Sequence, residues 1–298
     1  MVNLKVYIKD EKLLELTLNL MGTIQAVSKK LHNGEFESGQ NGTLNEFGDL
    51  QLKADKEIDD MISSNLPEYC SLWSSEEHPN MNFTREGEPL YSVAYDPLDG
   101  SSIFDANLTV GTIVSVWPGN FMNQTGHDQA IAIMAVYGPK TTIALAVNDK
   151  YSLVGRTCIE LTLINGSWKY IKTLAISDSA KTFSPGNLRY VNKNETYKEL
   201  VNHWIDGGYT LRYTGGLVPD IFHMLSKGQG VLTNIPSKLR LVYECCAIAL
   251  IVEASGGKSS NFKDGKSVLS LPITDLNEIV GVCFGSSKEV ELFNSKFF

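Results

Sequence analysis

The chain has 298 residues, a formal net charge of −8 at pH 7 and 43% hydrophobic residues. That length suits two domains or one large one, and it buries enough apolar surface to fold without disulfides. The composition excludes intrinsic disorder, and no apolar run reaches the roughly 18–20 residues of a membrane span. An excess of 34 Asp+Glu over 26 Lys+Arg argues against sequence-independent nucleic-acid binding. We therefore expect neither a membrane nor a nucleic acid as partner.

The cysteines indicate a reducing compartment. They are odd in number, and no spacing resembles a zinc site or a C-x-x-C redox pair. The five are Cys70, Cys158, Cys245, Cys246 and Cys283. We expect buried, reduced thiols. Residues 1–12 hold no apolar signal core, so a cytoplasmic location is the default, and a plastid location would require a trimmed transit segment.

The first half of the chain predicts two helices followed by a sheet. Apolar residues recur every three or four positions over 11–32, which predicts a helix that Asn33-Gly34 ends. Residues 33–48 are rich in Gly, Asn and Glu and predict a loop, and a second helix fits 52–65. Segments rich in Val, Ile, Thr and Tyr then predict strands over 70–73, 90–95, 109–117, 130–137, 140–147, 158–164 and 168–174.

The second half alternates helices with short strands. The run from Ser177 to Asn187, which contains Pro185-Gly186, is the predicted boundary between the halves. Helices then fit 195–205, 219–227 and 243–255, and strands fit 231–234 and 279–284. We therefore predict an α+β half over residues 1–180 and an α/β half over residues 181–298.

The segment Asp96-Pro97-Leu98-Asp99-Gly100-Ser101-Ser102 carries the strongest chemical signal. A strand delivers Asp96, Pro97 fixes the backbone and Gly100 permits a sharp turn, so two carboxylates can face one spot. Unpaired like charges there favour a bound divalent cation. The small hydroxyl residues and free N–H groups that follow suit phosphate oxygens. The same pattern is also that of an ordinary turn.

Three further acidic features can complete such a site: Glu76-Glu77, Asp49 with Asp55, and Glu244. Each also has a structural explanation. Adjacent glutamates are typical of a solvated surface, and the two aspartates lie around the start of the 52–65 helix, where acidic residues are favoured. The last carboxylate enters an apolar helix and needs a partner, which can be a cation or Lys238 or Arg240 just upstream.

Together these motifs identify a resemblance. The combination of D-P-L-D-G-S-S at 96–102, Glu76-Glu77 and K-L-R-L-V-Y-E at 238–244 resembles the family of fructose-1,6- and sedoheptulose-1,7-bisphosphatases. This family lies within the metal-dependent, lithium-sensitive sugar and inositol phosphatases. The segments 109–119, 183–189, 209–220 and Thr233-Asn234 resemble the sedoheptulose branch more closely. The resemblance implies a layered α-β-α-β-α sandwich of two fused halves, combining α+β and α/β character.

The resemblance also implies roles. Glu76, Glu77, Asp96, Asp99, Glu244 and the carbonyl of Leu98 would hold two or three Mg²⁺ per subunit, with Mn²⁺ as an alternative. Asp49, Asp55 and Glu77 would position the attacking water, and Gly100, Ser101 and Ser102 would cradle the reacting phosphate. Arg212, Tyr213 and Lys238 would bind the sugar and distal phosphate, joined by Asn187 and Arg189. The substrate would be a small sugar bisphosphate, and the enzyme a homo-oligomer, dimer or tetramer, with Arg212 reaching across a subunit boundary.

Departures from the family pattern bear on regulation and substrate. Residues 34–49 contain no cysteine, so control through a dithiol pair before Asp49 is not expected. Leu90-Tyr91 and Pro118 stand where animal-type fructose bisphosphatases carry AMP-binding cations, so AMP inhibition is not expected. A fructose-1,6-bisphosphatase or a dual-specificity enzyme is the main alternative, and an inactive metabolite-sensing homologue is a remote one. The sequence leaves the pathway open.

Overall fold

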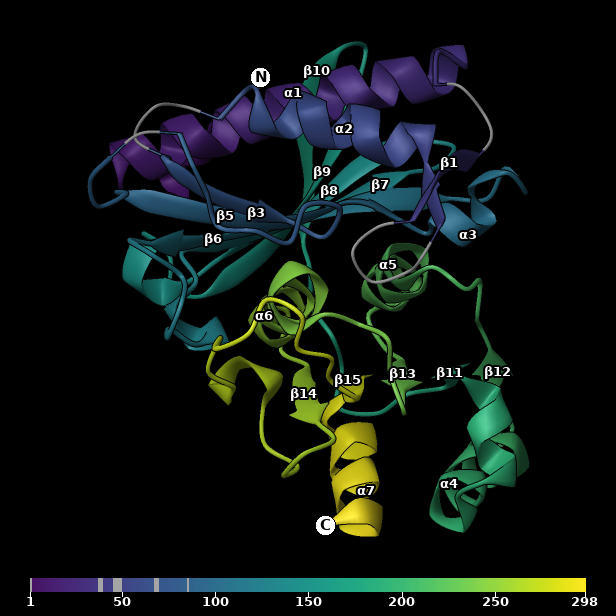
Figure 1. Ribbon diagram of the computed structural model, residues 1–298. Coiled ribbons are helices and arrows are strands. Elements are labelled where there is room, and N and C mark those ends of the chain that lie inside the picture. Colours follow the sequence, from purple (N-terminus) through teal and green to yellow (C-terminus); the bar gives the residue numbers. More distant parts are fainter. Residues whose placement is uncertain (1, 37–39, 45–49, 67–69, 85) are drawn as a thin grey trace.

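The computed structural model describes residues 2–36, 40–44, 50–66, 70–84 and 86–298. Figure 1 shows five layers: a helical layer, an eight-stranded sheet, a second pair of helices, a five-stranded sheet and a last helical layer. Helices α1 (Glu11–Asn33) and α2 (Lys53–Ser63) cover the outer face of the large sheet. The predicted sandwich of mixed α+β and α/β character is therefore confirmed.

The large sheet has the strand order β10-β9-β8-β7-β6-β5-β3-β4. Its strands are β3 (Leu72–Ser75), β4 (Asn82–Phe83), β5 (Tyr91–Asp99), β6 (Val110–Pro118), β7 (Ile131–Tyr137), β8 (Thr141–Val147), β9 (Thr157–Ile164) and β10 (Ser167–Thr173). The predicted strands lie within or beside these bounds. All neighbours are antiparallel except β3 and β5, which run parallel with Ser75 opposite Tyr95. Residues that follow these two positions therefore lie side by side.

The small sheet has the order β12-β11-β13-β15-β14. Its strands are β11 (Thr182–Gly186), β12 (Thr210–Leu211), β13 (Val231–Asn234), β14 (Lys258–Asn261) and β15 (Val282–Gly285). Strand β11 pairs in parallel with both β12 and β13. Because these three strands point the same way, the segments after them meet at one edge of the sheet.

The helices mostly follow the predicted pattern. Helix α1 begins after Asp10, whose side chain accepts the Leu13 N–H, and ends at Gly34, whose φ of 65° suits glycine. The others are α3 (Ser101–Phe104), α4 (Glu195–Asp206), α5 (Leu217–Lys227), a π-helix (Leu241–Cys245), α6 (Cys246–Ala254) and α7 (Ser287–Phe297). Among the described residues no helix is long and apolar enough to cross a bilayer.

One of the predicted segments was wrong in part. The region predicted as a loop over 33–48 contains β1 (Gln40–Leu44), which pairs with β2 (Leu50–Leu52). The run predicted as the boundary, 177–187, contains strand β11. Pro185 lies beyond the two residues of β11 that pair with β12, so its missing N–H costs no hydrogen bond to β12. The division at residue 180 stays a prediction.

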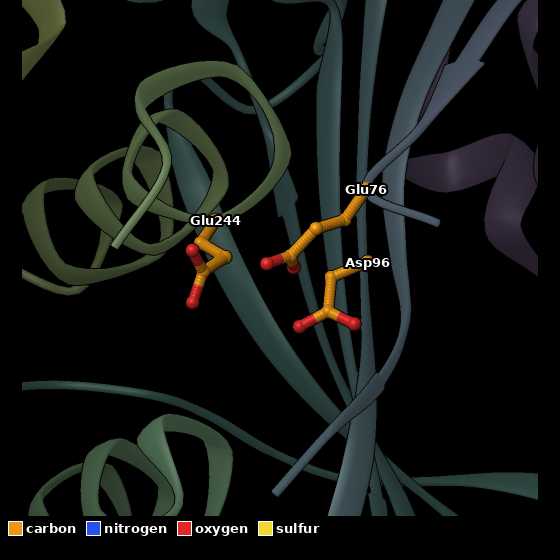
Figure 2. A group of neighbouring side chains, drawn as sticks. All are labelled: Glu76, Asp96 and Glu244. Carbon is orange, nitrogen blue, oxygen red and sulfur yellow. The ribbon is translucent and has the colours of Figure 1, made fainter. Parts of the chain in front are cut away.

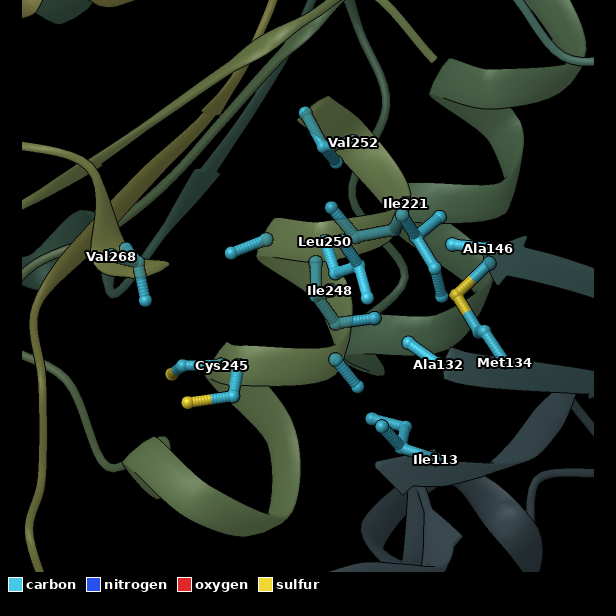
Figure 3. Close-up of a cluster of buried hydrophobic side chains, with 14 of the residues drawn as sticks. Ile113, Ala132, Met134, Ala146, Ile221, Cys245, Ile248, Leu250, Val252 and Val268 are labelled. Carbon is cyan, nitrogen blue, oxygen red and sulfur yellow. The ribbon is translucent and has the colours of Figure 1, made fainter. Parts of the chain in front are cut away.

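The largest hydrophobic cluster lies between the two sheets. It joins residues of the large sheet, such as Met134 and Ala146, to Ile221 of α5 and Leu250 of α6 (Figure 3). Helix α6 is fully buried from Cys246 to Val252, which explains its apolar residues on every side. The two halves therefore share one core, to which Leu241 and Tyr243 of the π-helix also belong.

The cysteines support a prediction on redox control. All five are free and fully buried, and burial raises the thiol pKa of Cys70 and of Cys158 to about 12. Buried, protonated thiols react slowly. We expect dithiol reductant and mild oxidant to leave the rate of phosphate release within about twofold of the untreated rate. Several-fold activation by dithiothreitol, reversed by oxidant, would contradict this.

Candidate active site

Three carboxylates converge where the large sheet faces the inner helices. Glu76 follows β3, Asp96 lies in β5, and Glu244 lies in the π-helix before α6. One oxygen of each lies within 4.8 Å of the others, and Figure 2 shows the three side chains grouped between the strands and the π-helix. Asp96 and Glu244 are only 6% and 5% exposed. Three acidic groups from distant parts of the sequence thus form one buried cluster.

Local backbone structure explains why Glu76 and Asp96 meet. The parallel register of β3 and β5 places them side by side, and the Glu76 N–H donates to the Tyr95 carbonyl at 3.0 Å. Glu76 is half-buried, so the alternative of a solvated surface for these glutamates does not hold. The D-P-L-D segment is part of β5 and not an isolated turn.

A π-turn places Glu244. The Cys245 N–H donates to the Arg240 carbonyl five residues earlier, at 3.0 Å, and such turns often occur at functional sites. Glu244 Oε2 accepts the Arg240 N–H at 2.5 Å. The Tyr243 hydroxyl lies 2.8 Å from Ser74 Oγ, which ties the π-helix to β3 just before the glutamates. Of the alternatives left open for Glu244, Arg240 is thus a partner through its backbone N–H.

The electrostatics of the cluster favour a cation. Burial, and after it the charge of Glu76, raises the pKa of both Asp96 and Glu244 well above its usual range. Buried carboxylates this close must take up protons or share a positive ion. Their hard oxygen ligands suit Mg²⁺ or Mn²⁺, and the cluster contains neither His nor Cys among the described residues. The residues therefore fit the divalent cations that the sequence predicted.

Asp99 lies beside this cluster with a second set of partners. Its two oxygens accept the N–H groups of Leu217 and Val218, at 3.0 and 2.6 Å, in the first turn of α5. Burial raises its pKa to about 6, against the opposing effect of these hydrogen bonds. Its charge contributes to the raised pKa values of Asp96 and Glu244. An ionised carboxylate has about four acceptor positions, so Asp99 can bind a cation and still hold α5.

Four predicted catalytic or metal-binding residues remain, and the structure describes three of them. Asp55 is 3% exposed on α2, and its charge contributes to the raised pKa of Asp96, so it lies near the cluster. Glu77 is half-buried beside Glu76, and its N–H donates to Ser75 Oγ at 3.2 Å. The buried Leu98 donates its N–H to Asp96 Oδ1 at 2.9 Å. Asp49 lies outside the described residues.

The predicted phosphate cradle follows Asp99 directly. Gly100 has a φ of 90°, a value that favours glycine, and it turns the chain from β5 into α3. Ser101 and Ser102 form the first turn of that short helix and are partly or fully exposed. Their backbone N–H groups therefore begin a helical turn within a few residues of the carboxylates.

The predicted distal-phosphate residues follow the three parallel strands of the small sheet. Asn187 comes after β11, Arg212 and Tyr213 after β12, and Lys238 after β13. Arg189, Arg212, Tyr213 and Lys238 are exposed. Asn187 Nδ2 donates to the Pro236 carbonyl at 3.0 Å, so this amide has a structural partner already. The carboxyl ends of parallel strands are the usual ligand edge of such sheets, which agrees with the predicted placement.

Sequence reasoning missed two groups that support the site. Asp220, which is 4% exposed in α5, accepts the Thr214 N–H at 2.8 Å and so fixes the loop after Arg212. Burial raises its pKa to about 6. The contact between Ser74 and Tyr243 is the other. An acidic residue in the first turn of the 219–227 helix was the available signal for Asp220.

Comparison with known proteins agrees with this geometry. Residues 5–173 match the family model of the fructose-1,6-bisphosphatase N-terminal domain, and residues 176–297 match that of its C-terminal domain. A chloroplastic sedoheptulose-1,7-bisphosphatase of Triticum aestivum is 39% identical over 97% of this chain and 74% of its own length. A class 1 fructose-1,6-bisphosphatase of Syntrophotalea carbinolica is 34% identical over 98% and 92%.

A solved structure shows the same fold. The crystal structure of a Toxoplasma gondii protein, provisionally assigned as a sedoheptulose-1,7-bisphosphatase, superposes with a TM-score of 0.86. It is 33% identical and covers 97% of this chain and 94% of its own. The layered fold and the buried acidic cluster thus define a sugar bisphosphatase, a phosphoric monoester hydrolase. The chain belongs to the fructose-1,6-bisphosphatase family, as its motifs predicted.

Proposed function

We propose that this enzyme hydrolyses the 1-phosphate of sedoheptulose 1,7-bisphosphate, giving sedoheptulose 7-phosphate and inorganic phosphate. The convergence of Glu76, Asp96 and Glu244 beside the D-P-L-D segment carries the phosphatase part of this proposal. The sedoheptulose part is supported by the relatives. The wheat sedoheptulose-1,7-bisphosphatase is 39% identical to the chain and the bacterial fructose-1,6-bisphosphatase is 34% identical.

In the proposed mechanism the cation ligands are those that the motifs implied. Glu76, Glu77, Asp96, Asp99, Glu244 and the Leu98 carbonyl would hold two or three Mg²⁺, or Mn²⁺. Divalent cations supply Lewis-acid stabilisation of the phosphoryl oxygens and the leaving alkoxide in reactions of this class. Asp49, Asp55 and Glu77 would orient the attacking water and accept its proton, because a carboxylate held close to a water can act as a general base.

The chain's own donors would hold the two ends of the substrate. Backbone N–H groups at Gly100, Ser101 and Ser102 would bind the reacting phosphate. Arg212, Tyr213 and Lys238 would bind the distal phosphate and the sugar, with Asn187 and Arg189 beside them. Arg–phosphate contacts are strong because the hydrogen bonds are charge-assisted. The alternative substrate is fructose 1,6-bisphosphate, for which the bacterial relative is named.

Substrate choice gives a direct test. We expect the ratio of kcat to KM to be higher for sedoheptulose 1,7-bisphosphate than for fructose 1,6-bisphosphate, measured as phosphate release with and without Mg²⁺. The two substrates differ by one carbinol unit, so the preference should be roughly 10–200-fold. Arg189→Ala should raise KM more for the seven-carbon substrate, because Arg189 is proposed to contact its displaced phosphate.

Lys193 is the control for Arg189. It is also a cation, and it lies at the end of the same 3₁₀-helix (Leu188–Asn192). Lys193→Ala should leave both KM values unchanged. Equal losses on the two substrates in Arg189→Ala, or a wild-type preference for fructose 1,6-bisphosphate, would replace the proposal with the alternative.

We also propose a homo-oligomer and a cytoplasmic location. Strand β12 lies at the edge of the small sheet, and Leu211 and Tyr213 are 52% and 54% exposed there beside Arg212. Such an edge suits a second copy of the chain. The free, buried cysteines suit a reducing compartment. Light scattering of the purified protein would give the number of subunits.

A further inference from the structure

A histidine and an aspartate outside the proposed ligand set are joined by a short contact. His78 Nδ1 lies 2.6 Å from Asp59 Oδ2. The Asp59 side chain is 2% exposed and the His78 side chain is 46% exposed. An ionised carboxylate can only accept a hydrogen bond, so Nδ1 is the donor of this contact in the tautomer that pairs with an ionised Asp59. A buried carboxylate needs such a donor, since burial without a partner is costly.

His78 closes the turn that carries the two glutamates. Its N–H donates to the Ser75 carbonyl at 3.1 Å, which makes Glu76 and Glu77 the two central residues of the turn. The first half of that turn is fixed to the sheet, because the Glu76 N–H donates to the Tyr95 carbonyl at 3.0 Å. The His78 side chain supplies an anchor at the other end of the turn, one residue after Glu77.

Asp59 lies on the helix that carries the second proposed water-positioning residue. It follows Asp55 by one turn of α2, and both side chains are on the buried face of this helix. Asp55 is 3% exposed, and α2 packs against β5, the strand that carries Asp96. The Tyr95 hydroxyl donates to the Asp59 carbonyl at 3.5 Å, which places Asp59 beside the strand that delivers Asp96.

These contacts point to a function for the pair. We propose that Asp59 and His78 are positioning residues that fix the Glu76-Glu77 turn against α2, and so set Glu77 relative to Asp55. Neither residue touches the reacting atoms. The inference rests on the proposed function for its kinetic readout. It adds to that function a reason why Glu77 and Asp55, which come from separate elements, keep a fixed relative position.

The test uses three replacements of His78. Asn can place its amide nitrogen where the imidazole Nδ1 lies, Gln places it one carbon further away, and Ala removes it. We expect His78→Asn to keep kcat within about twofold of the wild-type value, because the bond to Asp59 is retained. His78→Gln and His78→Ala should lower kcat by about tenfold or more at nearly unchanged KM for the sugar bisphosphate.

A double-mutant cycle with Asp59 and a surface control complete the design. Asp59→Ala should lower kcat as His78→Ala does, and the double variant should lose no more than either single one. Asp60, the exposed neighbour of Asp59 on α2, is the matched control, and Asp60→Ala should change nothing. Because His78 is half-exposed, its variants should fold, and melting temperatures would show this.

Mg²⁺ binding to the full-length protein, measured by calorimetry after a chelator has removed bound metal, gives a readout that does not depend on turnover. We expect weaker binding in His78→Ala and wild-type binding in His78→Asn. Equal losses in Asn and Gln variants, additive losses in the double variant, or unchanged kcat and Mg²⁺ affinity in His78→Ala would overturn the inference. If the wild type released no phosphate from any sugar bisphosphate, the proposed function would fail, and the Mg²⁺ titrations would still decide on the pair.

Discussion

Replacing Glu244 by Gln is expected to abolish phosphate release and, at pH 8, to raise the melting temperature of the metal-free protein. Gln keeps the shape of the side chain, and its amide oxygen can accept the Arg240 N–H that Glu244 accepts at 2.5 Å. The substitution removes a proposed cation ligand, so we expect a loss in kcat of at least about a hundredfold. Chelation of the wild type should cause a similar loss.

The stability gain follows from the raised pKa of Glu244, which burial and the charge of Glu76 cause. A carboxyl whose pKa is higher in the folded than in the unfolded state loses stability as the pH rises through the folded value. Gln cannot ionise, so the variant avoids this loss. The gain, a few degrees by thermal unfolding, should therefore be present at pH 8 and small at pH 5.

Glu195 provides the control for this substitution, because its side chain is 72% exposed at the start of α4. Glu195→Gln should change neither the rate nor the melting temperature. Near-normal turnover by Glu244→Gln, or by the wild type in chelator, would remove the proposed cation site. A melting temperature that falls at pH 8 would show that the metal-free cluster is not a source of repulsion.

Asp99→Asn is expected to lower both the rate and the stability, in contrast to Glu244→Gln. Both oxygens of Asp99 accept N–H groups from the first turn of α5, that is, from Leu217 and Val218. An amide in their place turns an NH₂ donor toward one of these donors, which leaves a buried N–H without an acceptor. We expect a loss of about 1–3 kcal/mol in the free energy of unfolding and of at least about a hundredfold in kcat.

Asp220→Asn separates the two effects of Asp99. Asp220 lies in α5, the helix whose first turn Asp99 binds, and it accepts the Thr214 N–H. It is not a proposed cation ligand. We expect Asp220→Asn to lower the free energy of unfolding, measured by urea denaturation, and to leave Mg²⁺ affinity unchanged. Wild-type stability in Asp99→Asn would refute the role of Asp99 in holding α5. Wild-type turnover would refute its role as a cation ligand.

The spacing of apolar residues predicted most helices and strands of the fold, but it did not predict the short or polar ones. The repeat over 11–32 predicted α1 to within a residue, because a 23-residue helix with one apolar face leaves a long pattern. Strand β14 was missed because its buried Ser259, Ser260 and Asn261 are polar and satisfied by hydrogen bonds. Helix α7 was missed although Val290 and Phe293 mark its buried face.

The candidate site shows the same division between local and long-range information. The residue types and the D-P-L-D spacing predicted which carboxylates to examine. The sequence did not show that Glu76 and Asp96 would be neighbours, since that follows from the parallel register of β3 and β5. Nor did it show that Asp99 would bind α5, which begins more than a hundred residues later. Predicted roles at the substrate end, such as that of Arg212, stay predictions.

The parallel pairing of β3 with β5 has a consequence for synthesis on the ribosome. Glu76 and Asp96 can come together as soon as the N-terminal half has left the exit tunnel, well before Glu244 has been translated. Chains emerge from the N-terminus at roughly 5–20 residues per second, so this incomplete pair would exist for several seconds. Full cation affinity would then arise only when the π-helix brings Glu244 to Glu76 and Asp96. Tight metal binding by a newly made chain would therefore show that its two halves have joined.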